Sequence, residues 1–440
     1  MRVFLLLIVF LSSLALAQSN PIALVPLDSR PVNASLPVAI AASGSLEMVT
    51  PPAELLGTNT RPTDAQAIRT WLDAAQPSAL IVSLDALAYG GLVQSRFSQI
   101  SADEAWNNLW SAWFWHLSSP VYAFVVIPRA PDVVDRERNL AVIRRALDWA
   151  ADGTLQRLFV TWDDALPGSP APTEGAQIRA EAETRGLKNV FVHPGADEVA
   201  SALTASLLLE RLNLHPKLRV RFSDPAAAKN QFADYEGQTL TQSVVEQAQA
   251  IGLELSDDSD LELYVYNGGD PRKAVLEINS DQRRGLVALA DVNAVNQANP
   301  KLIQDLLASG GFAQLAGFAA WGTPGNNIGS ALAQATMVAV RGPSAASNAL
   351  LARGYVNDYL YSSQLRPVLR QGRLEDDFAA TDTRAALVAG LQQKLSEFRL
   401  GATRFRLQDA FFPWSRSFEI GFKLAARQSS TACLPVCFVP

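Results

Sequence analysis

The stretch LFVTWDDALPG, residues 158–168, indicates the fold class. Its apolar start ends at Trp162, two adjacent carboxylates follow at Asp163 and Asp164, and a Pro-Gly turn comes directly after. A short, continuously apolar run that ends in polar residues is typical of a strand buried on both faces of a parallel sheet. At such a strand end, the two acids suit three roles: capping the next helix, binding a cation, or acid/base chemistry.

The same pattern recurs along the chain. Short apolar runs rich in β-branched residues predict strands at 22–27, 46–50, 79–84, 121–127, 158–162, 190–192, 218–222, 261–266, 286–290 and 317–321. Amphipathic stretches predict helices between them at 64–75, 102–116, 134–151, 174–186, 196–212 and 238–252. Such alternation indicates parallel strands joined by right-handed helical crossovers.

The fold class is therefore α/β, built from parallel β/α units, and two arrangements remain open. One is a TIM-barrel-like domain, although the predicted strands exceed the eight of a single barrel. The other is a doubly wound parallel sheet, with two lobes as one form of it. We expect the α/β catalytic-like domain to span residues 18–344. Helical patterns replace the strand pattern after about residue 345, so we expect residues 345–440 to form a C-terminal helical appendage.

The first 17 residues have the order of a secretory signal peptide. Arg2 precedes the apolar run VFLLLIVFLSSLALA, which ends in small residues at Ala15 and Ala17. An N-terminal membrane anchor is the alternative for this stretch. No later stretch offers about 18 uninterrupted apolar residues, so we expect no integral membrane segment after signal removal. The sequence thus predicts a secreted or periplasmic protein.

Composition narrows the chemistry. The net charge is −6 without a Lys/Arg run, which argues against nucleic acid as a partner and favours a small-molecule or glycan substrate. The two cysteines, Cys433 and Cys437, suit a small disulfide loop in an oxidising compartment. Only three histidines are present, so a zinc site or a triad has few ligands to use. We expect no cofactor, and we expect carboxylates to carry any catalysis.

In both candidate folds, ligands bind beyond the carboxyl ends of the strands. We therefore take candidate site residues from the segments that follow strands. The catalytic candidates are Asp163, Asp164, Asp197 and Glu198. The substrate-binding candidates are Asp28, Arg30, Asn33, Asp85, Tyr89, Arg129, Asp291, Asn293, Trp321, Asn326 and Asn327.

The adjacent acids are the sharpest signal. In an extended backbone, neighbouring side chains point to opposite faces, so one acid is expected to face the pocket while the other braces a loop. Two acids in different environments can have separated pKa values, which suits acid/base work. Pro167 and Gly168 delay the next helix to about Thr173, itself a better cap than either acid. We also expect Trp162 and Trp321 on one rim, where an indole offers a flat face to a sugar ring.

Three other motifs have structural alternatives. Asp28 and Arg30 could hold substrate hydroxyls or brace the first loop by pairing with each other. Asp197 and Glu198 are predicted in the first turn of a helix, where the helix dipole favours acids without any site role. Asn326 could simply cap a helix.

Five ordered motifs carry a resemblance to a known family. They are PLDSRPVN, SLDALAYGGLVQSR, WDDALPG with Glu174 behind it, PGADEV and AAWGTPGNNIG. In that order they resemble the bacterial family known as domain of unknown function 4127. The resemblance covers about residues 22–335 and extends weakly to FPWSRSFEI at 412–420. The family name implies no mechanism.

Three functions fit these observations. The first is an exported, glycoside hydrolase-like enzyme, in which two carboxylates act on a glycosidic bond; an Asp pair that assists an acetamido substrate is a fold-level analogy. The second is a hydrolase in which Asp28, Asp85, Asp163 and Asp291 converge on Mg²⁺ or Ca²⁺. The third is a non-catalytic exported sugar-binding protein.

Overall fold

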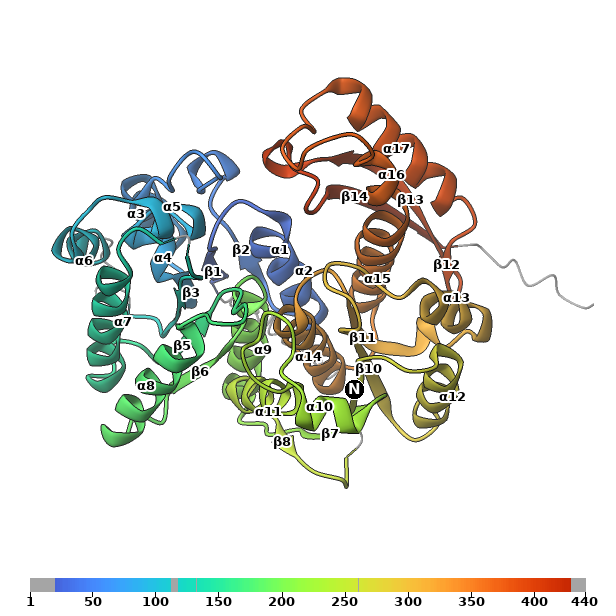
Figure 1. Ribbon diagram of the computed structural model, residues 1–440, viewed down its shortest axis with the longest axis horizontal. Helices are drawn as coiled ribbons and strands as arrows, with labels where there is room; N and C mark the ends of the chain where they lie inside the picture. The colour runs from blue at the N-terminus through green and yellow to red at the C-terminus, as the bar shows by residue number, and fades with distance from the viewer. Residues whose placement is uncertain (1–19, 112–117, 132, 260, 429–440) are drawn as a thin grey trace, which may run out of the picture.

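The structure is a computed structural model that describes residues 20–111, 118–131, 133–259 and 261–428. The described residues form two parallel sheets and one small antiparallel sheet (Figure 1). The signal-type stretch 1–17 and the pair Cys433 and Cys437 lie outside the described residues. No helix among the described residues is long and apolar enough to cross a membrane.

The first lobe is built on a parallel sheet with the order β2-β1-β3-β4-β5-β6. Its strands are β1 (Ile22–Val25), β2 (Met48–Val49), β3 (Ala79–Ser83), β4 (Val121–Ile127), β5 (Arg157–Trp162) and β6 (Val190–Pro194). Its helices are α1 (Pro31–Ala34), α2 (Leu36–Ser43), α3 (Ala65–Ala75), α4 (Leu84–Ala88), α5 (Leu92–Phe97), α6 (Ala102–Ser111), α7 (Arg136–Ala151), α8 (Ala171–Thr184) and α9 (Val199–Leu212).

Both faces of this sheet are buried, which explains its continuously apolar strands. In β1, Ile22 and Leu24 pack on one face with α2 and α9, whereas Ala23 and Val25 pack on the other with α3 and α7. Successive side chains of a strand point to opposite faces, so each strand supplies two cores. The sheet is therefore doubly wound.

The second lobe repeats this plan. Its parallel sheet has the order β8-β7-β9-β10-β11, the same second-first-third-fourth-fifth order as the start of the first sheet. Its strands are β7 (Lys217–Phe222), β8 (Glu254–Leu255), β9 (Leu261–Tyr266), β10 (Leu286–Asp291) and β11 (Leu315–Ala319). Its helices are α10 (Pro225–Asn230), α11 (Leu240–Ile251), α12 (Pro271–Asp281), α13 (Pro300–Ser309) and α14 (Pro324–Arg341).

Helices α9 and α14 lie between the two sheets (Figure 1). Helix α9 is buried from Val199 to Leu209, and over this stretch its sequence VASALTASLLL is apolar or small on every side. A helix that is apolar all round must be covered all round. One core consequently joins Leu24 of β1, Leu203 of α9, Leu263 of β9 and Met337 of α14.

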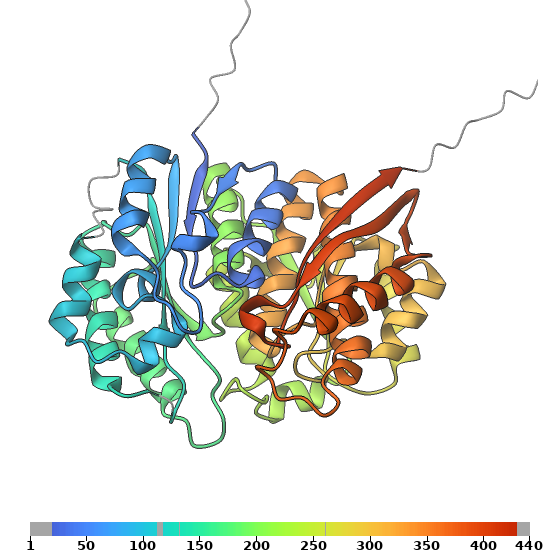
Figure 2. The same ribbon diagram turned by 90° about the horizontal axis from the view of Figure 1, so that it is seen from above.

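The C-terminal region contains more than the expected helices. After α14 come α15 (Ala345–Gly354), a π-helical segment (Tyr355–Leu365), α16 (Arg366–Leu369) and α17 (Thr381–Leu395). The antiparallel strands β12 (Arg399–Leu400), β13 (Thr403–Phe411) and β14 (Gly421–Gln428) follow. Figure 2 shows β13 and β14 as a long pair beside the second lobe. In TRFRLQDAF, residues 403–411, Phe405 and Leu407 are buried and alternate with more exposed side chains. Such alternation is typical of a strand, and the expectation of a helical region did not take it into account.

Of the two arrangements left open by the sequence, the chain adopts the doubly wound one, split into two lobes. A closed barrel does not form, because α9 leaves the first sheet after β6 and β7 starts a separate sheet. Some predicted boundaries also differ. The strand expected at 46–50 is limited to Met48–Val49, and α8 begins at Ala171, two residues before the cap expected at Thr173.

Candidate functional site

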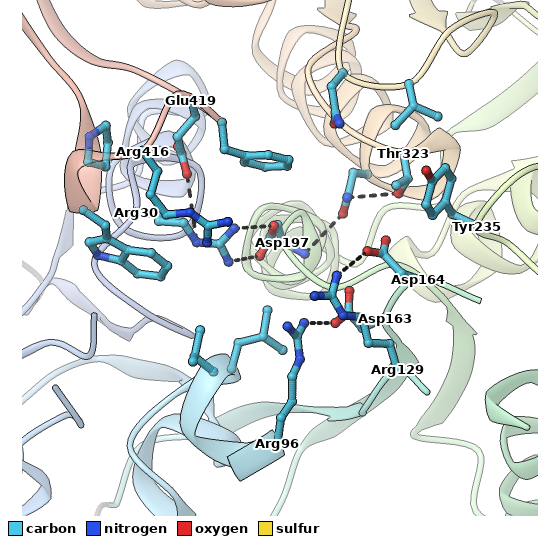
Figure 3. A pocket seen from close by; sticks show the side chains of 18 residues that line it. Arg30, Arg96, Arg129, Asp163, Asp164, Asp197, Tyr235, Thr323, Arg416 and Glu419 are labelled. Carbon is cyan, nitrogen blue, oxygen red and sulfur yellow. Dashed lines mark hydrogen bonds and ion pairs between the residues drawn. The ribbon is translucent and has the colours of Figure 1, made fainter. Parts of the chain in front are cut away.

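A cavity of about 340 Å³ lies beyond the carboxyl ends of the strands of the first sheet. Loops of the second lobe and the segment between β13 and β14 complete its wall (Figure 3). Its lining residues are Arg30, Leu92, Val93, Arg96, Arg129, Asp163, Asp164, Asp197, Tyr235, Val295, Asn296, Thr323, Asn326, Pro413, Trp414, Arg416, Phe418 and Glu419. All three parts of the chain thus contribute to one site.

Arg30 joins two of the predicted acids. Its Nη2 donates to Asp28 Oδ2 at 2.8 Å, and its Nη1 donates to Asp197 Oδ2 at 2.9 Å. Asn33 Nδ2 donates to Asp28 Oδ1 at 3.0 Å and to Asp197 Oδ1 at 3.1 Å. These charge-assisted bonds join the loop after β1 to the loop after β6. Asp28 and Asn33 therefore stand behind Arg30 and orient it.

Asp197 is also held from the second lobe. Asn326, near the start of α14, accepts the backbone N–H of Asp197 at 3.2 Å and donates to Thr323 Oγ1 at 3.1 Å. Asn326 is helical, and Thr323 precedes the helix, so Asn326 is not its cap. Its amide instead connects α14 to the cavity floor.

Glu419 and Trp414 close the cavity from the C-terminal region. Glu419 Oε1 lies 3.9 Å from Arg30 Nε, and burial raises the pKa of Glu419 to about 8, although Arg30 opposes this shift. Trp414 Nε1 donates to Ser29 Oγ at 2.9 Å, and its ring centroid lies 5.2 Å from the Arg30 guanidinium carbon. Trp414 and the adjacent Ser415 have φ of 55° and 57°, a backbone strain of the kind often found at functional sites.

The adjacent acids Asp163 and Asp164 both line the cavity, contrary to the expected division of roles. Asp164 has φ of 24°, so the backbone leaves the extended form directly after Asp163 and turns the second carboxylate to the same side. Asp163 is closely paired with Arg96, and Asp164 Oδ2 lies 3.0 Å from Arg129 Nη1. Figure 3 shows the two pairs side by side.

The two acids differ in environment. Burial, together with the neighbouring charge of Asp163, raises the pKa of Asp164 to about 6 despite its pairing with Arg129. Asp163 is fixed by Arg96, which lies on α5. Both acids thus lie beside an arginine, but the raised pKa of Asp164 suits it to hold a proton.

Three candidates from the first lobe lie behind the cavity wall. Asp85 accepts the Val126 backbone N–H at 2.8 Å, and burial raises its pKa to about 7. Tyr89 is buried with its ring 4.8 Å from the Arg138 guanidinium carbon. Glu198 accepts the Ala196 N–H at 3.0 Å, and burial raises its pKa to about 8.

The helix prediction around Asp197 and Glu198 needs a correction. Helix α9 begins only at Val199, so both acids precede it instead of lying in its first turn. Glu198 occupies the cap position without a side-chain cap bond, because its carboxylate turns back to the N–H of Ala196. Of the two, only Asp197 lines the cavity.

The late-strand candidates have mainly structural contacts. Asp291 accepts the backbone N–H groups of Asn293 and Asn299, at 3.2 and 2.5 Å. Asn327 accepts the Gly322 N–H at 2.9 Å and donates to the Asp291 carbonyl at 2.9 Å. Asn293 is exposed and lines a second cavity.

The two tryptophans do not share a rim. Trp162 is buried beneath α8, where a Cβ on Gly175 would lie 2.8 Å from its ring, and its Nε1 donates to the Glu236 carbonyl at 2.9 Å. Trp321 is buried beside Asn357 and Arg353 and faces a small separate cavity. The aromatic groups of the cavity are Trp414, Phe418 and Tyr235.

Sequence reasoning did not single out Arg96, Tyr235, Trp414, Arg416 and Glu419. Arg96 ends the motif SLDALAYGGLVQSR, and three of the others lie within FPWSRSFEI, so motif membership was the available signal. None directly follows a strand of a parallel sheet. A search limited to strand ends therefore omits them.

The four carboxylates proposed for a cation do not meet. Asp28 is bonded to Arg30, Asp163 to Arg96, and Asp291 to backbone N–H groups. Across the described ranges, no group of three or more His, Cys, Asp or Glu residues could hold a metal ion. Among the described residues, the four carboxylates therefore do not form the Mg²⁺ or Ca²⁺ cluster of the alternative hypothesis.

Fold and site together define a two-lobed α/β protein with a charge-paired cavity at the carboxyl edges of its sheets. The chain belongs to the family described as "Protein of unknown function (DUF4127)", which it matches over residues 22–137 and 133–423. The second match includes FPWSRSFEI, so the loop carrying Trp414 and Glu419 lies within it. Neither the curated proteins nor the solved structures include a significant match to the chain.

Proposed function

We propose that this protein is an exported, carbohydrate-active hydrolase that resembles glycoside hydrolases in its use of two carboxylates. The observation that carries the proposal is the adjacent pair in the cavity. Asp164 has a pKa raised to about 6, whereas Asp163 is fixed by the Arg96 guanidinium. Glycosidases use two acids whose environments separate their protonation states. The signal-type order of residues 1–17 supports export.

The charge balance of the cavity favours a neutral substrate. Within the described chain, each lining arginine lies beside a carboxylate: Arg30 with Asp28 and Asp197, Arg96 with Asp163, Arg129 with Asp164, and Arg416 with Asp376 at 2.8 Å. A phosphate or carboxylate ligand would have to compete with these internal partners. Sugar hydroxyls, by contrast, can both donate to the carboxylates and accept from the guanidinium groups.

In this proposal each acid has a role. Asp164 donates its proton to the leaving oxygen as the glycosidic C–O bond breaks. Asp163 accepts a proton from water, whose oxygen forms the new bond to the anomeric carbon. Arg96 and Arg129 orient the two carboxylates, and the faces of Trp414 and Tyr235 suit contact with a sugar ring.

A second candidate is a non-catalytic exported sugar-binding protein. The observation that favours it is the use of both lobes, with equal strand order, to enclose one cavity. Two-lobed binding proteins also hold their ligands between domains. This candidate predicts that the parent protein binds sugars and hydrolyses none.

The test is a screen of chromogenic glycosides followed by Asp164→Asn. The amide keeps the shape of the side chain but cannot donate an acidic proton, so turnover should fall by about 10²- to 10⁴-fold. In the parent protein, turnover should also fall as the pH rises above about 6, because Asp164 then loses its proton. Initial rates from pH 4 to 9 measure both effects.

Asp64→Asn is the matched control, because Asp64 caps α3 at the Ala67 N–H outside the cavity, and its activity should stay at the parent level. Loss of activity with EDTA, restored by Mg²⁺ or Ca²⁺, would favour the metal hydrolase. Sugar binding without turnover of any glycoside would favour the binding protein. Equal turnover by Asp164→Asn and the parent would remove Asp164 as the acid.

A further inference from the structure

A second cavity of about 140 Å³ adjoins the first, at the carboxyl edge of the second sheet. Its wall comes from the segments that follow β7, β9 and β10. Val295 lines both cavities. The second cavity lies where β7 is flanked by β8 and β9, the point of the strand order at which open α/β sheets bind ligands.

Three segments pass from one cavity to the other. In the segment 231–236, Asp234 lines the second cavity and Tyr235 lines the first. In the segment 292–296, Ala294 lines the second cavity and Asn296 lines the first. At the start of α14, Pro324 lines the second cavity and Thr323 lines the first. These segments form a saddle between the two cavities.

The saddle is held in place by backbone contacts. Tyr235 and Asn296 have φ of 69° and 60°. Asn adopts this left-handed conformation readily, whereas a bulky residue such as Tyr235 is held there by its surroundings. The Tyr235 carbonyl accepts the Ala165 N–H at 2.8 Å, and the Asn296 N–H donates to the Gly322 carbonyl at 3.1 Å. Both turns are thus tied to neighbouring segments at the cavity boundary.

The side chain of Glu236 connects the segment 231–236 to α14. Its Oε1 accepts the Gly325 N–H at 2.8 Å, at the start of α14. Burial raises the pKa of Glu236 to about 7. The saddle is therefore held by a buried contact within the second lobe, and the bond from the Ala165 N–H to the Tyr235 carbonyl ties it to the first lobe.

The second cavity has the chemistry of a sugar subsite. The side chain of Phe232 is 73% exposed, so it offers a large aromatic face to solvent at the cavity wall. The amide of Asn293 and the carboxylate of Asp234 lie in the same wall and are exposed. An aromatic face beside amide and carboxylate groups suits a ring whose faces are apolar and whose edge carries hydroxyls.

We propose that the second cavity is an extension subsite, so that the substrate is a glycan chain that crosses the saddle and contacts both lobes. The inference rests on the proposed carbohydrate function and narrows its substrate to oligosaccharides or longer glycans. The unit at the bond to be cleaved lies in the first cavity beside Asp163 and Asp164. Units farther along the chain lie against Phe232 and Asn293.

The test measures sugar binding to the full-length Asp164→Asn protein by calorimetry, with the glucose and N-acetylglucosamine series of one to five β-1,4-linked units. Affinity should rise with chain length, because added units reach the second cavity. Phe232→Ala should weaken binding of the longer sugars by about 3- to 10-fold, the loss expected for one aromatic contact. It should leave the binding of the single sugar unchanged.

Leu276→Ala is the control, because Leu276 is equally exposed, at 71%, on α12 and lines neither cavity. Equal affinity for one and five units would overturn the subsite while leaving the proposed function intact. An equal loss for single and longer sugars in Phe232→Ala would also overturn it. If the protein binds no sugar of either series, the proposed function fails, and the subsite fails with it.

Discussion

The carboxyl edges of the two sheets differ in what their carboxylates contact, although their strands follow the same order. In the first lobe, Asp163 and Asp164 meet guanidinium groups inside the cavity. In the second lobe, Asp224 accepts the Ala227 N–H at 3.0 Å and caps α10, and Asp291 accepts backbone N–H groups of its own loop. Acids that follow strands thus form part of a charged site after β5 of the first lobe and hold local backbone structure after β7 and β10 of the second lobe.

The difference originates in segments remote from the acids themselves. Arg96 reaches Asp163 from α5, 67 residues earlier in the chain, and Arg129 follows β4. In the second lobe, Asp224 and Asp291 instead accept N–H groups no more than eight residues away. An acid after a strand therefore becomes a site residue when another element brings a cation to it.

Removing one such cation should have the largest effect on stability. Arg96→Met leaves Asp163 buried without its charge partner, which should lower the free energy of unfolding by about 3–5 kcal/mol. Turnover should fall as well, because Asp163 loses its fixed orientation. Urea unfolding followed by tryptophan fluorescence measures the first effect, and glycoside turnover measures the second.

Arg129→Met provides the contrast within the same site. The Arg129 side chain is 36% exposed, against 8% for Arg96, so solvent compensates for much of the lost ion pair. The expected cost is about 1 kcal/mol or less. If Arg96→Met and Arg129→Met lowered the free energy of unfolding equally, burial would not be what makes the pair of Arg96 and Asp163 strong.

Much of the fold was predictable, because local pattern determines it. Continuous apolar runs mark strands covered on both faces, and those runs identify β1, β3, β4, β5 and β9 closely. The choice between a barrel and two sheets was not predictable, because it depends on α9 and α14 packing between the lobes. The antiparallel pair β13 and β14 was missed, although alternation in TRFRLQDAF marks it.

The site was predictable only in part, for a related reason. Position after a strand identifies Arg30, Arg129, Asp163, Asp164 and Asp197, all of which line the cavity. The same signal also selects Asp85, Glu198 and Asp291, whose carboxylates instead accept backbone N–H groups behind it. Sequence position alone does not distinguish an acid that will meet an arginine from one that will bind the backbone.

The buried acids outside the cavity predict an unusual pH dependence of stability. Burial raises the pKa values of Asp85, Asp291 and Asp358 to about 7, and that of Glu198 to about 8, from 3.8 or 4.5 in the unfolded chain. Between these values the folded state keeps protons that the unfolded state releases. Their stabilising contribution is therefore complete below about pH 4 and is lost as the pH rises toward 8.

The melting temperature should consequently be higher at pH 5 than at pH 8, as differential scanning calorimetry would measure. Asp291→Asn should reduce this difference, because it removes one of the groups that must ionise. A melting temperature that stays constant or rises from pH 5 to pH 8 would show that the buried acids are ionised in the folded protein. In that case, these buried acids would be charged in both lobes of the folded protein.

The smallest effect is expected at Asp224, the acid that caps α10 in the second lobe. Asn is as good a helix cap as Asp, so Asp224→Asn should change the free energy of unfolding by less than about 0.5 kcal/mol, whereas Asp224→Ala should cost about 1 kcal/mol. Turnover should remain at the parent level in both, because Asp224 lines neither cavity. Urea unfolding and glycoside assays on the two variants measure these outcomes. A loss of turnover in Asp224→Asn comparable to that in Asp164→Asn would mean that charge, not capping, is what the chain uses at this position, and the contrast between the two lobes would no longer hold.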